Sequence, residues 1–273
     1  MSPPKDAAAL PPRALIVTLY GLYARESGGW LSVATLVKLM AALDVDEPAV
    51  RSAISRLKRR GVITPARVDG SAGYTIADHT RRMLDLGDRR IFERRQAELS
   101  DGWLLAVFSV PEAERDKRHL LRSRLAWLGF GTVSSGIWIA PQHLEDEARE
   151  VLDSFGSYVD LFRADHLGFG DLADKISAWW DLAELDELYS QFDSAHAPVL
   201  DAWERRRSVE GSDAFGDYIR TLTAWRRLPY LDPGLPAALL PAGWSGSRAA
   251  ATFDAIRGRL AEPAHGFVDA VRA

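Results

Sequence analysis

The chain has 273 residues, of which 47% are hydrophobic and 26% charged, and its formal net charge is −4. This is the composition of an ordinary globular protein, long enough for one large domain or two to three small ones. The lack of cysteine excludes a disulfide scaffold, a cysteine-based zinc site and a thiol nucleophile. No apolar run approaches the roughly 18–20 residues that span a bilayer, so we expect a soluble, cytoplasmic protein without a membrane partner.

Charge is unevenly distributed along the chain. Residues 1–96 contain 16 Lys and Arg against 10 Asp and Glu, a net charge of +6. Residues 97–273 contain 18 against 28, a net charge of −10. A basic front end on an acidic body favours a polyanionic partner for the front end alone, although basic surfaces are often merely solvated.

Three helices and a hairpin are predicted in the first third of the chain. Helical periodicity predicts helices at 13–25, 33–43 and 48–60. Two short apolar runs predict strands at 62–68 and 74–76. Pro48 suits the first turn of the third helix, and Gly61 suits the position after its end. A Gly-rich turn at 69–73 joins the two strands, and 80–98 is expected to be a charged connecting helix. This order is that of a winged helix-turn-helix domain.

The predicted helix at 48–60 has two different faces. On a helical wheel, one apolar stripe contains Val50, Ala53, Ile54 and Leu57. A helix in the major groove of DNA needs such a stripe to anchor it, and a polar face that offers donors to base edges and phosphates. We expect the bases to be contacted by Arg51, Ser52, Ser55 and Arg56. We expect the phosphates to be contacted by Lys58, Arg59 and the wing residue Arg67. The alternative is an ordinary surface helix with a solvated basic face.

The middle of the chain predicts a ferredoxin-like domain. Trp103–Val110 reads as a buried strand, and Glu112–Leu128 as an amphipathic helix with Leu120, Leu121, Leu125 and Leu128 on one side. A hairpin, a second helix and a last strand are then expected at Gly131–Val133, Gly136–Ala140, His143–Phe155 and Tyr158–Phe162. The order β-α-β-β-α-β is the ferredoxin-like plan.

From Leu172 onward the sequence predicts only helices, apart from a Pro-rich connector at 229–241. Aromatic residues beside arginines could stack on a ring of a ligand and hold its phosphates. The candidates for such an effector site are Trp179, Trp180, Trp225, Arg226 and Arg227. The alternative is that these tryptophans belong to the core.

Two further patterns do not support a cofactor or a metal. The stretch Gly168–Ala173 fits G-x-G-x-x-A, but a dinucleotide fingerprint needs the strand to run almost directly into the first glycine and a parallel strand afterwards. The six histidines show no H-x-x-x-H spacing, although a site assembled by the fold stays open. We predict no cofactor, no metal ligand and no catalytic residue.

These observations predict an α+β multidomain protein with three domains. Residues 1–98 are expected to form the winged helix-turn-helix DNA-binding domain with its connecting helix. Residues 99–168 are expected to form the ferredoxin-like domain, and residues 169–273 an all-helical C-terminal domain that could bind an effector.

The chain resembles the PaaX-like family of regulators, repressors of phenylacetate catabolism, over essentially its whole length. PAVRSAISRLKRRGVI (Pro48–Ile63) is similar to their recognition-helix segment, and the middle of the chain to their domain related to the CRISPR-associated endoribonuclease Cas2. The most specific likeness is in WDLAELDELYSQF (Trp180–Phe192) and WRRLPYLDPGLPAALLPAGWSG (Trp225–Gly246).

The resemblance implies a homodimeric transcriptional repressor that binds double-stranded operator DNA and is released by an acyl-CoA thioester such as phenylacetyl-CoA. We expect the Cas2-like domain to be a dimerisation scaffold, because it departs at Ser109 from the pattern of the Cas2 enzymes. A metal-dependent nuclease of the Cas2 type is one alternative, but this chain has Ser109 where those enzymes carry an aspartate, and a neutral hydroxyl is a poor ligand for Mg²⁺. The other alternative is a winged-helix module that binds a protein.

Overall fold

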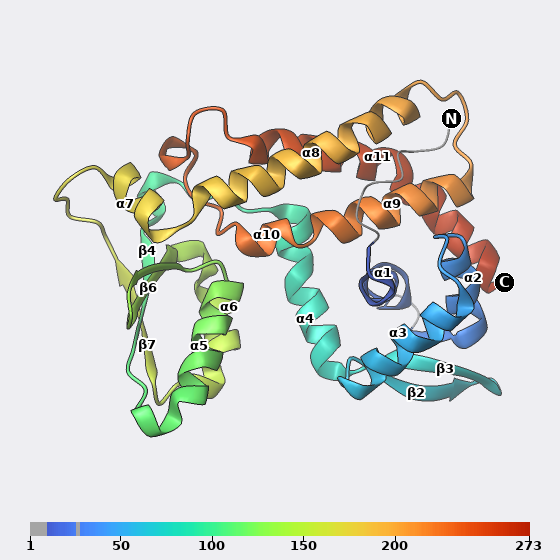
Figure 1. The fold of residues 1–273 in the computed structure, drawn as a ribbon, viewed down its shortest axis with the longest axis horizontal. Coiled ribbons are helices and arrows are strands. Elements are labelled where there is room, and N and C mark those ends of the chain that lie inside the picture. Colours follow the sequence, from blue (N-terminus) through green and yellow to red (C-terminus); the bar gives the residue numbers. More distant parts are fainter. Residues whose placement is uncertain (1–9, 26–27) are drawn as a thin grey trace. The chain divides into compact units, whose positions relative to one another are not determined.

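The computed structural model describes residues 10–25 and 28–273, which pack as two compact units (Figure 1). Unit 1 consists of the described residues up to Gly87 together with 191–225 and 247–273. Unit 2 consists of 88–190 and 226–246. Helices from the last third of the chain therefore contribute to both units, while the three-domain division stays a prediction about the sequence.

The N-terminal part of unit 1 contains the predicted helices and hairpin and one strand that was not predicted. Its elements are α1 (Pro12–Leu19), a π-helical segment η1 (Tyr20–Ala24), β1 (Trp30–Ser32), α2 (Val33–Ala41), α3 (Glu47–Arg59), β2 (Ile63–Val68), β3 (Ser71–Ile76) and α4 (Asp78–Asp88). The three strands form an antiparallel sheet of order β1-β3-β2.

Strand β1 escaped prediction because three residues are too few to show a period. Its pairing with β3 depends on a close approach of Trp30 to Gly73, which has no side chain. A Cβ atom at Gly73 would lie 2.5 Å from the Trp30 indole and 2.4 Å from the carbonyl oxygen of Leu31. Only glycine is compatible with this packing.

The charged connecting helix is shorter than the sequence predicts. Helix α4 continues as a π-helical segment, η3 (Arg89–Glu93), and the next residue, Arg94, has a φ of 43° in the left-handed region. This conformation ends the helix, so the prediction of helix up to residue 98 was wrong. Beyond this point the backbone forms hydrogen bonds outside the helix, and the Ala97 amide donates to the carbonyl oxygen of Gly234 at 2.8 Å.

The C-terminal helices complete unit 1. They are the second half of α8 (Leu182–Glu204), α9 (Gly211–Trp225) and most of α11 (Ser245–Arg272). Helix α9 packs against α1, where the hydroxyl groups of Thr18 and Thr223 lie 2.8 Å apart in a buried hydrogen bond. The Trp225 ring stacks on Phe253, with ring centroids 4.8 Å apart.

Unit 2 is built on a four-stranded antiparallel sheet of order β5-β6-β4-β7. The strands are β4 (Trp103–Phe108), β5 (Gly131–Ser134), β6 (Ile137–Pro141) and β7 (Val159–Ala164). The α-helices that lie wholly in this unit are α5 (Arg115–Trp127), α6 (Glu145–Leu152), α7 (Leu172–Trp179) and α10 (Leu228–Leu231). Short 3-10 helices occur at η4 (Leu99–Asp101), η5 (Glu112–Glu114), η6 (Gln142–Leu144), η7 (Asp153–Phe155) and η8 (Ala237–Leu239). The element order β-α-β-β-α-β is as predicted.

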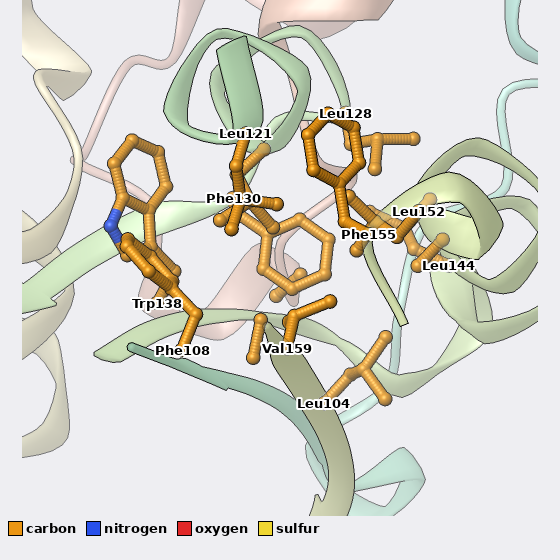
Figure 2. Close-up of a cluster of buried hydrophobic side chains, with 14 of the residues drawn as sticks. Leu104, Phe108, Leu121, Leu128, Phe130, Trp138, Leu144, Leu152, Phe155 and Val159 are labelled. Atoms are coloured by element: carbon orange, nitrogen blue, oxygen red, sulfur yellow. The ribbon is translucent and has the colours of Figure 1, made fainter. Parts of the chain in front are cut away.

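A hydrophobic core fills the space between one face of the sheet and helices α5 and α6 (Figure 2). Alternate residues of β4 and aliphatic residues of α5 meet there, among them Leu104, Leu121 and Leu125. Leu120 was predicted on the same side, but it is 48% exposed. Leu121, Leu125 and Leu128 are spaced by four and three residues and share one stripe, whereas Leu120 is rotated by roughly 100° from Leu121.

The other face of the sheet is covered only in part. Trp103 and Ile139 pack under Trp180, Ile176 and Leu235. On the remaining part, Val107, Ile137 and Phe162 are exposed. No helix in the described ranges 10–25 and 28–273 is long and apolar enough to cross a membrane.

Two adjacent residues of α5 allow a direct test of this core. Leu121→Ala should lower the free energy of unfolding by about 2–5 kcal/mol, because it removes a fully buried side chain and leaves a cavity. Leu120→Ala is the control, with an expected change below about 1 kcal/mol, since its side chain is half exposed. Urea unfolding of both variants measures the difference, and equal losses would contradict the packing of α5.

Candidate nucleic-acid interface

The apolar stripe predicted for the third helix is buried in the structure. Val50, Ala53, Ile54 and Leu57 of α3 are each at most 5% exposed. Helix α3 packs with this face against α1, α2 and β2. The stripe therefore holds α3 to the body of unit 1 and sets which of its faces points to solvent.

The opposite face of α3 is exposed and basic. All six side chains that the sequence assigns to DNA on this helix are exposed, namely Arg51, Ser52, Ser55, Arg56, Lys58 and Arg59. Arg51 is the one with an intrahelical partner, because its Nε donates to Oε1 of Glu47 at 2.7 Å. An exposed ion pair of this kind contributes little and is easily exchanged for a phosphate.

Local signals fix both ends of α3. The Asp46 carboxylate accepts a hydrogen bond from the Ala49 amide at 2.8 Å and caps the first turn. The basic residues Arg56, Lys58 and Arg59 lie in the last turn, where they complement the negative end of the helix dipole. The same basic residues therefore also stabilise the end of the helix.

The turn before α3 forms an ion pair with a helix from the far end of the chain. Asp44, in the connection between α2 and α3, has a left-handed φ of 62°. Its carboxylate accepts a hydrogen bond from Nη2 of Arg220 in α9 at 2.8 Å. Helix α9 thus contacts both α1 and the turn that aims α3.

One further residue predicted to contact DNA, Arg67, lies in the hairpin β2–β3. Arg67 is exposed, and its Nη1 donates to the carbonyl oxygen of Gly70 across the turn at 3.2 Å. Asp69 and Gly70 both have positive φ, as a tight two-residue hairpin turn requires. Arg67 and the basic face of α3 thus come from adjoining elements of unit 1 (Figure 1).

Sequence reasoning omitted two exposed basic residues of this region. Arg60 follows α3 directly and Lys38 lies on α2, and both side chains are exposed. The continuous run Lys58–Arg60 was a signal that could have included Arg60. Lys38 carries no such signal, because it stands alone in an otherwise apolar helix.

The candidate effector residues do not form one group. Trp180 is buried in unit 2, and its indole Nε1 donates to the carbonyl oxygen of Gly129 at 2.8 Å. Trp179 lies beside it, with ring centroids 6.3 Å apart. Trp225 is fully buried in unit 1, whereas Arg226 and Arg227 belong to unit 2. Both Trp180 and Trp225 therefore serve as core residues in this conformation, and a role in effector binding stays a prediction.

Ser109 lies just beyond the end of β4 and is exposed. Its amide donates to the carbonyl oxygen of Tyr158 at 3.0 Å. Glu114 pairs with Lys117 and accepts a hydrogen bond from the Tyr158 hydroxyl. These two interactions hold the pKa of the Glu114 carboxyl below its ordinary value. Within the described residues, no three His, Asp or Glu side chains form a group that could hold a metal ion.

Comparisons with known proteins match most of the chain. Three family models match in succession: "PaaX-like protein" at residues 11–80, "PaaX protein central Cas2-like domain" at 96–176, and "PaaX-like protein C-terminal domain" at 180–270. The chain is 27% identical over 263 residues to "Transcriptional repressor PaaX" of Escherichia coli (strain K12), which covers 93% of this chain and 82% of that protein.

A solved structure shows the same fold. It is that of "Uncharacterized protein Rv0674 from Mycobacterium tuberculosis", with a TM-score of 0.62 and 22% identity. The match covers 95% of this chain and 99% of that one. At this identity the likeness concerns the fold alone.

Proposed function

Because the chain belongs to the PaaX-like family and is similar to a transcriptional repressor, we propose that it represses transcription by placing α3 in the major groove of operator DNA. The observation that carries this proposal is the two-sided character of α3. Its aliphatic stripe is buried, and its hydroxyl and guanidinium groups are exposed. Such a helix offers donors to base edges and to phosphates at the same time.

The rest of the N-terminal region supports a winged helix-turn-helix. Helix α2 and the short turn up to Asp46 precede the recognition helix, and the hairpin β2–β3 follows it as the wing. In this proposal Arg51, Ser52, Ser55 and Arg56 approach the bases, and Lys58, Arg59 and Arg67 contact phosphates. The wing tip at Asp69 and Gly70 would touch the backbone or the minor groove. The alternative of a winged-helix module that binds a protein predicts no binding to an operator.

We further propose that the repressor acts as a homodimer on a two-fold related site in the cytoplasm. Dimeric helix-turn-helix proteins read half-sites about 10 bp, or a multiple of it, apart. The exposed part of the unit 2 sheet supports a contact between two copies, because Val107 and Ile137 are paired neighbours on β4 and β6 and Phe162 on β7 is 51% exposed. Burying large apolar side chains of this kind favours association.

The family resemblance supports a further step, which concerns regulation. We propose that the target genes serve the catabolism of an aromatic acid such as phenylacetate, and that an aryl-CoA or acyl-CoA thioester releases the repressor. Release requires that the effector bind better to a conformation that fits the operator poorly. An aromatic-acid degradation cluster among the neighbouring genes would support this proposal.

Arg56→Ala and Arg59→Ala should each weaken operator binding by about 1–3 kcal/mol if their guanidiniums contact bases. If a residue contacts only phosphate, the loss should be similar for all DNA sequences and the salt slope should fall by about one unit. A gel shift with the DNA upstream of the gene, at two salt concentrations, measures both. Arg205→Ala, an exposed arginine just beyond α8, is the control. Unchanged affinity in both test variants would refute this placement of α3.

The nuclease alternative would require a metal ligand at the position of Ser109. Because a hydroxyl replaces the metal-binding carboxylate there, we expect the protein to leave RNA and DNA intact when Mg²⁺ or Mn²⁺ is added. Product analysis on denaturing gels tests this expectation. Metal-dependent cleavage that disappears in Ser109→Ala would show that the Cas2-like domain is an enzyme.

The proposed dimer can be tested at the exposed face of the sheet. Phe162→Glu should convert the protein from a dimer to a monomer, because a charged group would be buried at the centre of the contact. Light scattering after size-exclusion chromatography measures the mass. Leu120→Glu alters a comparably exposed leucine on α5 and should leave the dimer intact. A wild-type protein with the mass of one chain would rule out this assembly.

A further inference from the structure

Unit 2 contains a cluster of buried and half-buried charged and aromatic side chains that the DNA interface does not use. We call it the Arg90 cluster, and its members are Arg90, Trp127, Glu147, Arg226 and Tyr230. Arg90 is only 8% exposed. Its Nε donates to Oε2 of Glu147 at 2.7 Å, and its Nη2 donates to the carbonyl oxygen of Leu128, at the end of α5, at 2.8 Å.

Two buried polar atoms of this cluster make no hydrogen bond to a described residue. Nη1 of Arg90 and Oε1 of Glu147 are enclosed, and neither has a hydrogen-bond partner among the described residues. A buried guanidinium or carboxylate atom without a partner is rare in folded proteins, because its desolvation is not compensated. A donor on Arg90 is therefore available to a guest molecule, and the carboxylate of Glu147 stabilises the guanidinium when no guest is present.

The residues around Arg90 add further donors for an anion. The guanidinium carbon of Arg90 lies 5.6 Å from the centroid of the Tyr230 ring, which stacks on Trp127 with ring centroids 4.8 Å apart. Burial raises the pKa of Tyr230 to about 12, so its hydroxyl remains protonated and can donate. Charges of both signs act on that hydroxyl, namely the negative charges of Glu147 and Asp88 and the positive charges of Arg90 and Arg226. Guanidiniums and a hydroxyl are the donors that proteins use for phosphates and carboxylates.

Two members of the cluster, Arg90 and Arg226, lie close to the points where the chain enters unit 2. The chain passes between the units after Gly87, Ser190, Trp225 and Gly246. Arg90 follows the first of these points closely, and Arg226 is the first residue after the third. Just before the second point, Tyr189 donates to the Asp232 carboxylate at 2.8 Å, two residues beyond Tyr230. A molecule bound here would act on segments that lead directly into the DNA-binding unit.

We propose that the Arg90 cluster is an anion site that holds a phosphate group of the effector. This inference rests on the proposed function, in which the effector is a thioester of coenzyme A and carries phosphates. The guanidiniums of Arg90 and Arg226 bind the anion, and the Tyr230 hydroxyl donates to it. Binding draws Arg90 away from Glu147 and changes how η3 is held against α5 and α6. A purely structural cluster would stabilise unit 2 without affecting any ligand.

The test uses the full chain with three probes, which are phenylacetyl-CoA, coenzyme A and phenylacetate. Calorimetry gives the dissociation constant of each, and a gel shift reports release of operator DNA. Arg226→Gln should weaken the binding of phenylacetyl-CoA at least tenfold and leave operator binding without a probe unchanged. Arg122→Gln is the matched control, because Arg122 lies near the Trp138 ring in the same unit but outside the cluster. Its affinity for the probe should equal that of the wild type.

The probes also distinguish the two kinds of anion. Weaker binding of coenzyme A in Arg226→Gln assigns the site to phosphate. Weaker binding of phenylacetate alone would mean that a carboxylate binds there, and it would overturn the assignment to a phosphate of the thioester. Tyr230→Phe retains the ring and its stacking on Trp127 but loses the hydroxyl. It should therefore also weaken the binding of phenylacetyl-CoA, without lowering the melting temperature of the free protein.

The outcomes separate this inference from the proposed function. Unchanged probe affinity in both Arg226→Gln and Tyr230→Phe overturns the site, while release of the operator by phenylacetyl-CoA would still support the repressor. A lower melting temperature with unchanged probe affinity shows that the cluster is structural and also overturns the site. If no probe binds the wild-type protein and operator binding is normal, the effector class fails together with this inference.

Discussion

Burial of the stripe Val50, Ala53, Ile54 and Leu57 is the constraint on which the proposed DNA interface depends. Because these side chains are anchored against α1, α2 and β2, the opposite face of α3 cannot turn inward without exposing them to water. The backbone positions of the serines and arginines on that face are therefore fixed relative to the body of unit 1. This placement favours recognition of base edges, because only the side chains then lose freedom on binding.

Unit 1 depends on helices from both ends of the chain. Helix α9 contacts α1 through the buried pair Thr18 and Thr223, and it contacts the turn before α3 through Arg220 and Asp44. The C-terminal third is thus part of the support of α3 rather than an appendage. Helix α8 belongs to unit 2 at its beginning and to unit 1 at its end, so this support is covalently continuous with the Cas2-like unit.

The Cas2-like unit keeps the core of the fold and has Ser109 at the position where Cas2-type nucleases carry an aspartate. Strand β4 contributes Leu104, Ala106 and Phe108 to the core, while Ser109 beyond its end has a hydroxyl in place of a carboxylate. Charged groups of this unit that are shielded from solvent include Arg90, Glu147 and Asp232. Because function depends on the side chains of a site and not on the fold, the likeness to Cas2 does not by itself assign an activity to this unit.

Regular elements with a clear period were predictable, because local spacing alone determines which side chains share a face. The helical repeat of α3 placed its buried and exposed residues correctly, and the element order of unit 2 followed from alternating runs and turn residues. The sequence could not show β1, the early end of the helix at Arg94 or the exposure of Leu120. These features depend on the close approach of Trp30 to Gly73, on the pairing of Ala97 with Gly234 and on which stripe of α5 meets the sheet. The Arg90 cluster likewise joins residues far apart in the chain, and only the tertiary structure brings their charges together, because burial and pairing over such separations leave no local pattern in the sequence.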